Sequence, residues 1–212
     1  VETIGFYYGQ RHSVELNQRG PILDNIRRGW PSWNIRLRTD HMIDMSSAKL
    51  GEAGATALTD HGVTIGASKT NPNLPNTFLP GRNILFLTYA AALAYHRGLD
   101  TIVTGVCQTD YSGYPDCRAN TIKAIELAVS LGMDRDVSIE TPIMHINKAQ
   151  TWKLAHMVGG NDFVNLIVEH THTCYQGDRS QRHPWGYGCG VCPACTIRAK
   201  GWEEYQASLK GA

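Results

Sequence analysis

The chain has 212 residues, a mass of 23.4 kDa and a formal net charge of +1, so its length fits one medium domain whose hydrophobic core needs no disulfide bonds. The near-neutral charge gives no global basic field for nucleic acid, and no run of about 18 apolar residues and no charged leader predicts a membrane span or a signal peptide. We therefore expect a cytoplasmic protein, in which cysteine clusters bind metals or act in catalysis more often than they form disulfides.

The first half of the chain predicts two strands, a helix and a long loop. A strand is expected over Glu2–Gly9, a helix from His12 onward, and a second strand over the alternating stretch Asn34–Asp44. The polar stretch from about Thr59 to Arg82 ends in "TNPNLPNTFLPGRN" and has no helical period, so it is expected to be a loop. Loops of this length in compact domains are often functional.

The second half alternates helices and strands. "NILFLTYAAALAYHRG" (83–98) is apolar nearly all round and predicts a buried helix. It is followed by a strand in "DTIVTGV", a helix in "ANTIKAIELAVSLGM", a strand in "VSIETPI" and a helix in "NKAQTWKLAHMVGG", which closes on glycines. Regular alternation of strand and helix predicts an α/β fold with a parallel sheet covered on both faces, formed by one domain over residues 1–212.

Four cysteines near the C-terminus predict a metal site. Cys189, Cys192 and Cys195 form two overlapping C-x-x-C units, and Cys174 precedes them by fifteen residues. Four thiolates complete a tetrahedral Zn²⁺ site, and a closed site of this kind is structural because no position is open for substrate. A redox C-x-x-C pair or a disulfide is the alternative, but it leaves Cys195 unexplained. Three histidines remain alternatives to Cys174 as the fourth ligand: His170, His172 and His183.

Two further stretches are candidates for anion binding. Gly81, Arg82 and Asn83 precede a predicted helix, whose free N–H groups and dipole favour an anion, although a simple helix cap explains them equally well. Lys148 lies in the first turn of its predicted helix, where a cation opposes the dipole. A bound phosphate would explain this lysine, and a solvated side chain is the simpler alternative.

The loop "TGVCQTDYSGYPDCR" (104–118) follows a predicted parallel strand, and ligands of open α/β sheets bind beyond the carboxyl ends of the strands. A purely structural turn rarely needs so many polar and aromatic groups, so we expect this loop to bind the substrate. Its candidate residues are Asp110, Ser112, Tyr114, Asp116 and Arg118.

Five motifs taken in order resemble the 7-cyano-7-deazaguanine synthase family. They are "YYGQRH", "NTFLPGRNILFL", "TGVCQTDYSGYPDCR", "ETPIMHINKAQTW" and "CGVCPAC", and the resemblance runs from about Phe6 to Tyr205. It implies a cytoplasmic, usually homodimeric enzyme with an adenine nucleotide alpha-hydrolase-like (Rossmann-like) fold of the ATP-pyrophosphatase type. A zinc-binding helical region is then expected over about residues 170–212.

The resemblance also implies a reaction. The family converts 7-carboxy-7-deazaguanine, ammonia and ATP to 7-cyano-7-deazaguanine, a precursor of queuosine, by way of an acyl-adenylate and an amide. ATP is a co-substrate that is accompanied by Mg²⁺, and one structural zinc ion is bound per chain. The implied partners are these small molecules and a second copy of the chain, with no nucleic acid and no membrane.

The resemblance assigns roles to individual residues. Arg82 and Lys148 are expected to bind phosphates as the catalytic residues, because an ATP-splitting enzyme works mainly by positioning and by neutralising charge. Asp116 and Arg118 are expected on the deazaguanine, where a carboxylate accepts from ring and amine N–H groups and a guanidinium meets a carboxylate as a fork. The nucleotide side is expected to include Tyr8, Gly9, Gln10, Gly81 and Asn83, and the zinc ligands are expected to be Cys174, Cys189, Cys192 and Cys195.

Two departures from the family pattern leave other functions open. The family's Ser-Gly-Gly-x-Asp-Ser phosphate loop is absent from the given sequence, which starts at Val1, so we expect the sequence to begin after that loop. The step between Cys174 and Cys189 is long for the family, and "RSQRHPWGY" is expected to be a surface excursion. The alternatives are a zinc-stabilised non-catalytic binding protein and a related ATP-pyrophosphatase that acts on another substrate such as tRNA.

Overall fold

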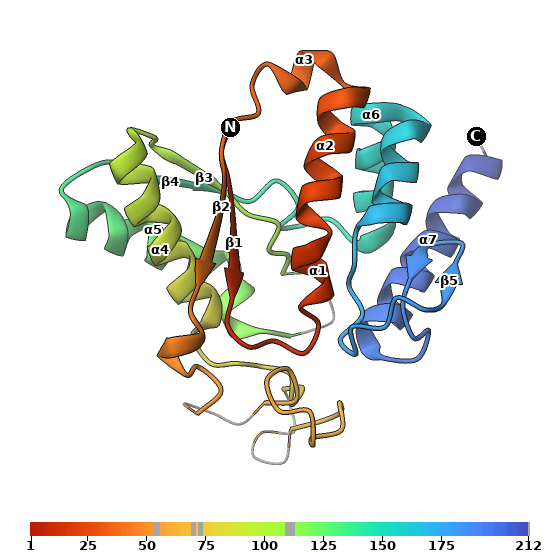
Figure 1. Ribbon diagram of the computed structural model, residues 1–212, viewed down its shortest axis with the longest axis horizontal. Helices are drawn as coiled ribbons and strands as arrows, with labels where there is room; N and C mark the ends of the chain where they lie inside the picture. The colour runs from red at the N-terminus through yellow and green to blue at the C-terminus, as the bar shows by residue number, and fades with distance from the viewer. Residues whose placement is uncertain (53–55, 69–70, 72–73, 109–112, 212) are drawn as a thin grey trace. The chain divides into compact units, whose positions relative to one another are not determined.

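The computed structural model describes residues 1–52, 56–68, 71, 74–108 and 113–211. The chain forms two compact units, one made of Val1–Ile65 with Lys148–Ala212 and the other of Gly66–Asn147. Figure 1 labels their helices and strands. No helix in the described ranges is long and apolar enough to cross a membrane.

The first unit begins with a pair of parallel strands. β1 (Thr3–Tyr7) pairs with β2 (Asp40–Asp44) in the register Thr3↔Asp40 to Tyr7↔Asp44. Parallel neighbours need a long crossover, which here contains three helices. These are α1 (Val14–Asn17), α2 (Arg19–Gly29) and α3 (Pro31–Asn34), and a 3₁₀ turn, η1 (Ser46–Ala48), follows β2.

The predicted strand over Asn34–Asp44 is too long at its start, because Pro31 opens the short helix α3 instead. Proline is favoured in the first turn of a helix, where its missing N–H has no partner to lose. The rings of Trp30 and Trp33 stack 5.3 Å apart at this helix, and each meets Phe163 edge-on. Aromatic packing therefore fixes a turn where the alternating pattern predicted an extended chain.

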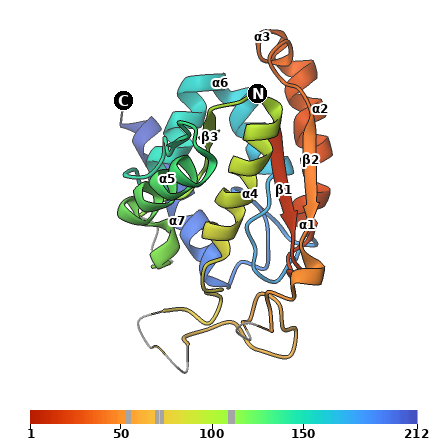
Figure 2. The same cartoon turned by 90° about the vertical axis from the view of Figure 1, so that its left-hand side faces the viewer.

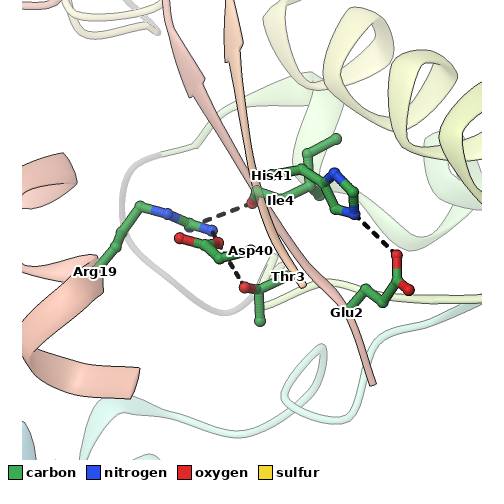
Figure 3. Close-up of polar contacts among 6 residues, drawn as sticks. All are labelled: Glu2, Thr3, Ile4, Arg19, Asp40 and His41. Carbon is green, nitrogen blue, oxygen red and sulfur yellow. Dashed lines mark hydrogen bonds and ion pairs between the residues drawn. The ribbon is translucent and has the colours of Figure 1, made fainter. Parts of the chain in front are cut away.

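A polar network ties the crossover helix α2 to both strands (Figure 3). Arg19 donates to the carbonyl of Ile4 over 3.3 Å and forms an ion pair with Asp40, whose carboxylate also accepts from the Thr3 hydroxyl over 2.6 Å. A Cβ atom on Gly5 would lie 2.8 Å from the Arg19 guanidinium carbon. Glycine at this position therefore lets the arginine lie directly on the strand.

The rest of the first unit is mainly two long helices. α6 (Lys148–His170) has non-helical geometry at Gly160, where φ is 68°, so the predicted helix does end at its glycines and a second helical segment continues to His170. α7 (Pro193–Lys210) packs against α6 around a core cluster. That cluster contains Trp152, Ala155, Val164, Val168 and Tyr205.

The second unit contains the other parallel pair, β3 (Thr101–Val103) with β4 (Ser138–Glu140). Its helices α4 (Arg82–Arg97) and α5 (Ala119–Met133) pack beside each other (Figure 2) and match the predicted ranges within one residue. As predicted, the described residues from 59 to 81 form no helix and no strand beyond one isolated bridge.

The prediction that α4 is buried nearly all round is wrong. Leu87, Ala90, Ala91 and Ala94 face the core, but four large apolar side chains are 38–49% exposed: Ile84, Leu85, Tyr89 and Tyr95. The helix is apolar on both faces, and in this chain only one face is covered.

The predicted parallel direction of the strands is confirmed in both pairs. Among the described residues the four strands form two separate two-stranded sheets, and a small antiparallel hairpin, β5 (Arg182–His183) with β6 (Gly186–Tyr187), forms a third. The single covered sheet and the single domain therefore stay predictions.

The contact between α6 and α7 yields a test of packing. A Cβ atom on Gly201 would lie 2.6 Å from Cβ of Lys148, an atom fixed to the backbone that cannot rotate away. Gly201→Ala should therefore lower the free energy of unfolding by about 1–3 kcal/mol, even though alanine is the better helix former. Gly132→Ala in α5 is the matched control, because its Cβ meets nothing within 4 Å, and it should leave stability equal or higher. Urea unfolding of both variants measures the difference, and equal effects would contradict the close approach.

Candidate functional site

The four predicted cysteines come together in the first unit. Cys174 follows α6, Cys189 and Cys192 lie in the turn before α7, and Cys195 is in the first turn of that helix. Their sulfur atoms all lie within 4.8 Å of one another, and the Cys189–Cys195 and Cys174–Cys192 pairs are each 4.0 Å apart. Zn–S bonds of 2.3 Å in a tetrahedron need sulfurs about 3.8 Å apart, so the donor set fits a tetrahedral thiophilic cation.

Glycine and backbone N–H groups build this cluster. A Cβ atom on Gly188 would lie 2.6 Å from the Cys195 sulfur, so only glycine fits between the ligands. The N–H of Cys189 donates to the sulfur of Cys174, and the N–H of Cys192 to the sulfur of Cys189, each over 3.4 Å. Donors of this kind stabilise thiolates, the form in which cysteine binds metals.

The thiols also shift one another's protonation. Hydrogen bonds from Cys192 and Cys195 lower the pKa of Cys174 below its ordinary value. The same contacts raise the pKa of Cys195, because a proton shared with a neighbouring thiolate is harder to remove. All four cysteines are free of disulfides. A cation entering the cluster therefore replaces protons rather than a covalent bond.

None of the three histidine alternatives joins the cluster. His183 bonds through Nε2 to the carbonyl of Gly188 and stacks on Trp185, and His170 lies 3.3 Å from the amide nitrogen of Asn25. His172 is buried and contacts Cys174 through a side-chain hydrogen bond, but it is not one of the four residues whose ligand atoms converge. Cys174 is the fourth member of the set, as the spacing indicated.

The prediction that "RSQRHPWGY" is a surface excursion is wrong in part. The segment contains the β5–β6 hairpin, and its Trp185 is 5% exposed and packs within the cysteine cluster. The indole of Trp185 is buried because it packs against the cysteines. The length of the segment does not reveal this contact.

The predicted substrate loop lines a cavity in the second unit. The cavity has a volume of about 370 Å³ and lies beyond the carboxyl end of β3, at the start of α5. Its lining residues are Cys107, Gln108, Gly113, Tyr114, Arg118, Ala119 and Asn120. Tyr114 and Arg118 therefore line this cavity, and their predicted contacts with the substrate stay predictions, whereas Asp110 and Ser112 lie outside the described residues.

Tyr114 is held firmly in this cavity wall. Its hydroxyl bonds to Oγ1 of Thr77 over 2.6 Å, and its ring lies 5.6 Å from that of Phe78. At the other side, Oε1 of Gln108 accepts from the N–H of Ala119 at the start of α5. These contacts present an aromatic face and a helix N-terminus to the same cavity.

Asp116 and Asn83 have structural roles here. Asp116 is 4% exposed, is not among the lining residues, and accepts the Asn83 N–H at the start of α4 over 3.0 Å. The Asn83 side chain in turn donates to the sulfur of Cys117. Gly81 precedes them with a φ of 75°, and Arg82 lies over the rings of Phe86 and Tyr114. The predicted ligand contacts of these residues stay predictions.

The nucleotide candidates of the first unit form a tight turn after β1. Gln10 is 3% exposed; it accepts the Tyr8 N–H and donates to the Phe6 carbonyl, and Gly9 has a φ of 81°. Arg11, which the sequence reasoning missed, donates to the carbonyls of Ala57, His61 and Val63. No local pattern could reveal these long-range bonds. Lys148 begins α6 as predicted.

Parallel strands, a pocket beyond a strand end and a four-cysteine cluster that could hold a metal ion define an α/β protein with a candidate metal site. The chain matches the family model described as queuosine biosynthesis protein QueC over residues 1–206, and it therefore belongs to that family. It is 57% identical over 209 residues to the 7-cyano-7-deazaguanine synthase of Polaromonas sp. strain JS666, covering 99% of this chain and 87% of that protein. Proteins of the same name from Parvibaculum lavamentivorans and Bordetella pertussis are 56% and 53% identical, covering 98% and 100% of this chain and 85% of each relative.

The cysteine cluster predicts a loss of both metal and stability in one variant. We expect about one zinc ion per chain in the parent protein; Cys192→Ser should lower the bound zinc well below that level and should lower the melting temperature, because metal binding adds to folding free energy. Cys107→Ser is the control, since that thiol lies in the cavity of the other unit. Metal analysis of reduced protein checks the prediction. Equal zinc in the two variants would contradict it.

The Asp116 contact predicts a stability difference between two substitutions. Asp116→Ala should lower the free energy of unfolding by about 1–2 kcal/mol, because the Asn83 N–H loses its acceptor at a helix start. Asp116→Asn keeps an acceptor oxygen and should lose less than half of that amount. Asp134→Asn is a suitable surface control, because asparagine tolerates its left-handed φ of 49°. Equal losses for the alanine and asparagine variants would argue against the cap.

Proposed function

We propose that this protein converts 7-carboxy-7-deazaguanine and ammonia to 7-cyano-7-deazaguanine at the expense of ATP, in the formation of queuosine precursors. The observation that carries the proposal is the family match over residues 1–206, supported by relatives of that name that align with nearly the whole chain. The cavity beyond β3 supports it further, because ligand sites of α/β proteins lie at that position.

The reaction explains the need for ATP. A carboxylate resists ammonia because oxide is a poor leaving group, so attack of the carboxylate on the α-phosphorus releases pyrophosphate and gives an acyl-adenylate. Ammonia displaces AMP and forms the amide. A second adenylation at the amide oxygen, followed by loss of protons and AMP, leaves the nitrile. Two ATP are thus split for each nitrile, and Mg²⁺ is expected with each.

The lining of the cavity suits the carboxylated base. Arg118 supplies a guanidinium for the carboxylate, a pairing that is stronger than a neutral hydrogen bond. The ring of Tyr114 offers an apolar face to a flat heterocycle. The N-terminal end of α5, with its free N–H groups and positive dipole end, favours the substrate carboxylate. A volume of about 370 Å³ is within the range of small-ligand sites.

The remaining assignments belong to the same proposal. Arg82 and Lys148 bind phosphates, and the turn from Tyr8 to Gln10 lies on the adenosine side. The four cysteines hold one structural zinc ion, and their sulfur spacing supports this. The family resemblance supports a Rossmann-like, adenine nucleotide alpha-hydrolase-like domain that acts as a cytoplasmic homodimer on small molecules.

The test is an assay of the full-length protein with 7-carboxy-7-deazaguanine, ammonium and Mg-ATP. Mass spectrometry should detect the nitrile, with about two AMP formed for each nitrile, as the two adenylations require. In the same assay Arg118→Gln should lower kcat/KM for the carboxylate about 10- to 100-fold, the loss of a charged hydrogen bond of roughly 1.5–3 kcal/mol.

Arg135→Gln is the matched control, because Arg135 belongs to the same unit but lies over Tyr95, away from the cavity. It should retain parental kcat/KM. Parent protein that splits no ATP with this substrate would refute the proposed reaction. If the parent is active and Arg118→Gln matches it, the carboxylate binds elsewhere. Asp116→Asn tests the expected role of Asp116 in reading the base: loss of activity with most of the stability kept supports that role, and parental activity leaves Asp116 as the acceptor of the Asn83 N–H alone.

A further inference from the structure

The cysteine cluster of the first unit has a buried arginine beside it. Arg198 is 5% exposed and lies one helical turn after Cys195 on α7, a spacing that puts two side chains on the same face. Its Nε donates to the carbonyl of Trp185 over 2.8 Å, and its Nη2 to the carbonyl of Ile167 over 3.1 Å. It also lies over the ring of Trp152 at 5.3 Å.

This guanidinium has no carboxylate partner among the described residues, since its hydrogen bonds go to two backbone carbonyls. A buried charge is costly unless a group of opposite sign compensates it. Burial lowers the pKa of Arg198 to about 10, and the charge of Cys195 opposes that change. The arginine therefore remains a cation at neutral pH, and the negative charge that acts on it is that of Cys195 in the sulfur cluster.

The metal-loaded cluster would carry an excess of negative charge in a largely buried place. Four thiolates around one divalent cation carry a net charge of −2, and three of the four cysteines are buried. Trp185, in the turn of the β5–β6 hairpin, packs with the three buried cysteines. Gly186 leaves room for the arginine, because a Cβ atom there would lie 3.0 Å from its Nη2. The hairpin is thus shaped around this guanidinium.

We propose that Arg198 is the buried counter-cation of the metal–tetrathiolate cluster, a positioning residue that raises the affinity of the four cysteines for a divalent thiophilic cation. The inference rests on the proposed metal site. The guanidinium offsets part of the excess negative charge of the cluster. It also donates to the carbonyl of Trp185, and so helps to fix the β5–β6 hairpin, which Cys189 follows directly.

The competing explanation is that Arg198 simply caps the C-terminal end of α6 through the Ile167 carbonyl, where a cation is favoured. The chain offers a control for that role. Arg179 also donates to a carbonyl at this helix end, that of Glu169, and also lies over an aromatic ring, that of Tyr187 at 4.2 Å. Arg179 differs from Arg198 in location, because Arg198 lies on α7 with Cys195 and Arg179 does not.

The experiment measures zinc affinity by competition with a chromophoric chelator at pH 7.4, for the parent and for Arg198→Gln, Arg198→Lys and Arg179→Gln. Loss of an outer partner of a metal site lowers affinity about 10- to 100-fold, so Arg198→Gln should fall in that range. Arg198→Lys keeps the charge and should stay within about threefold of the parent, as should Arg179→Gln. Melting temperatures with and without zinc accompany each measurement, and Arg198→Gln should lose more stability in the zinc-loaded form.

Each outcome decides the matter. Equal affinity for Arg198→Gln and Arg179→Gln, or equal losses of stability with and without zinc, would make Arg198 a helix cap and overturn the proposal. If Arg198→Gln does not fold, the lysine variant decides alone, since a tenfold loss there overturns the proposal and near-parental affinity supports it. A parent protein that takes up no zinc would overturn the metal site itself. This outcome is distinguishable from zinc binding with the same affinity in the parent and all variants, which would overturn only the role of Arg198.

Discussion

The convergence of four sulfur atoms is the constraint on which the first unit depends. Cys174 lies after α6, Cys189 in the knuckle after the β5–β6 hairpin and Cys195 on α7, so one small cluster joins two helices and a hairpin. The hairpin has only two residues in each strand and does not fold by itself. Its position is set by the sulfurs, by Trp185 packed among them, and by Arg198 beneath.

The parts of this architecture that the sequence predicts are those fixed by local chemistry. The C-x-x-C spacing predicted three members of the cluster and the next cysteine upstream predicted the fourth, because a tetrahedral site needs four donors that can meet. The stretches that predicted α4 and α5 match the two helices within one residue. Trp185 was missed because nothing local distinguishes an indole at a surface turn from one that fills a space beside sulfur.

The polar residues of the substrate loop show a second limit of sequence reasoning. Arg118 and Asp116 are two residues apart and were expected to bind the same ligand, yet Arg118 lines the cavity and Asp116 turns to the start of α4. The choice depends on which unpaired donor lies nearest in space. In this loop the Asn83 N–H needed an acceptor, and an unsatisfied buried donor costs more than a solvent-exposed one. The sequence gives the residue types for both outcomes and no means to choose between them.

Three glycines lie where another group approaches the backbone closely. Gly5 admits Arg19 to the strand, Gly188 admits the sulfur of Cys195, and Gly201 admits the start of α6, and in each case an added Cβ would lie within 3 Å of its neighbour. None of these three has a positive φ, so turn chemistry gives no reason for them. Each is required by a group of another residue: the guanidinium of Arg19, the thiol of Cys195 or the Lys148 side chain at the start of α6. A glycine inside a predicted strand or helix without a turn to explain it is therefore a useful indication of where a functional or structural group of another segment comes to lie.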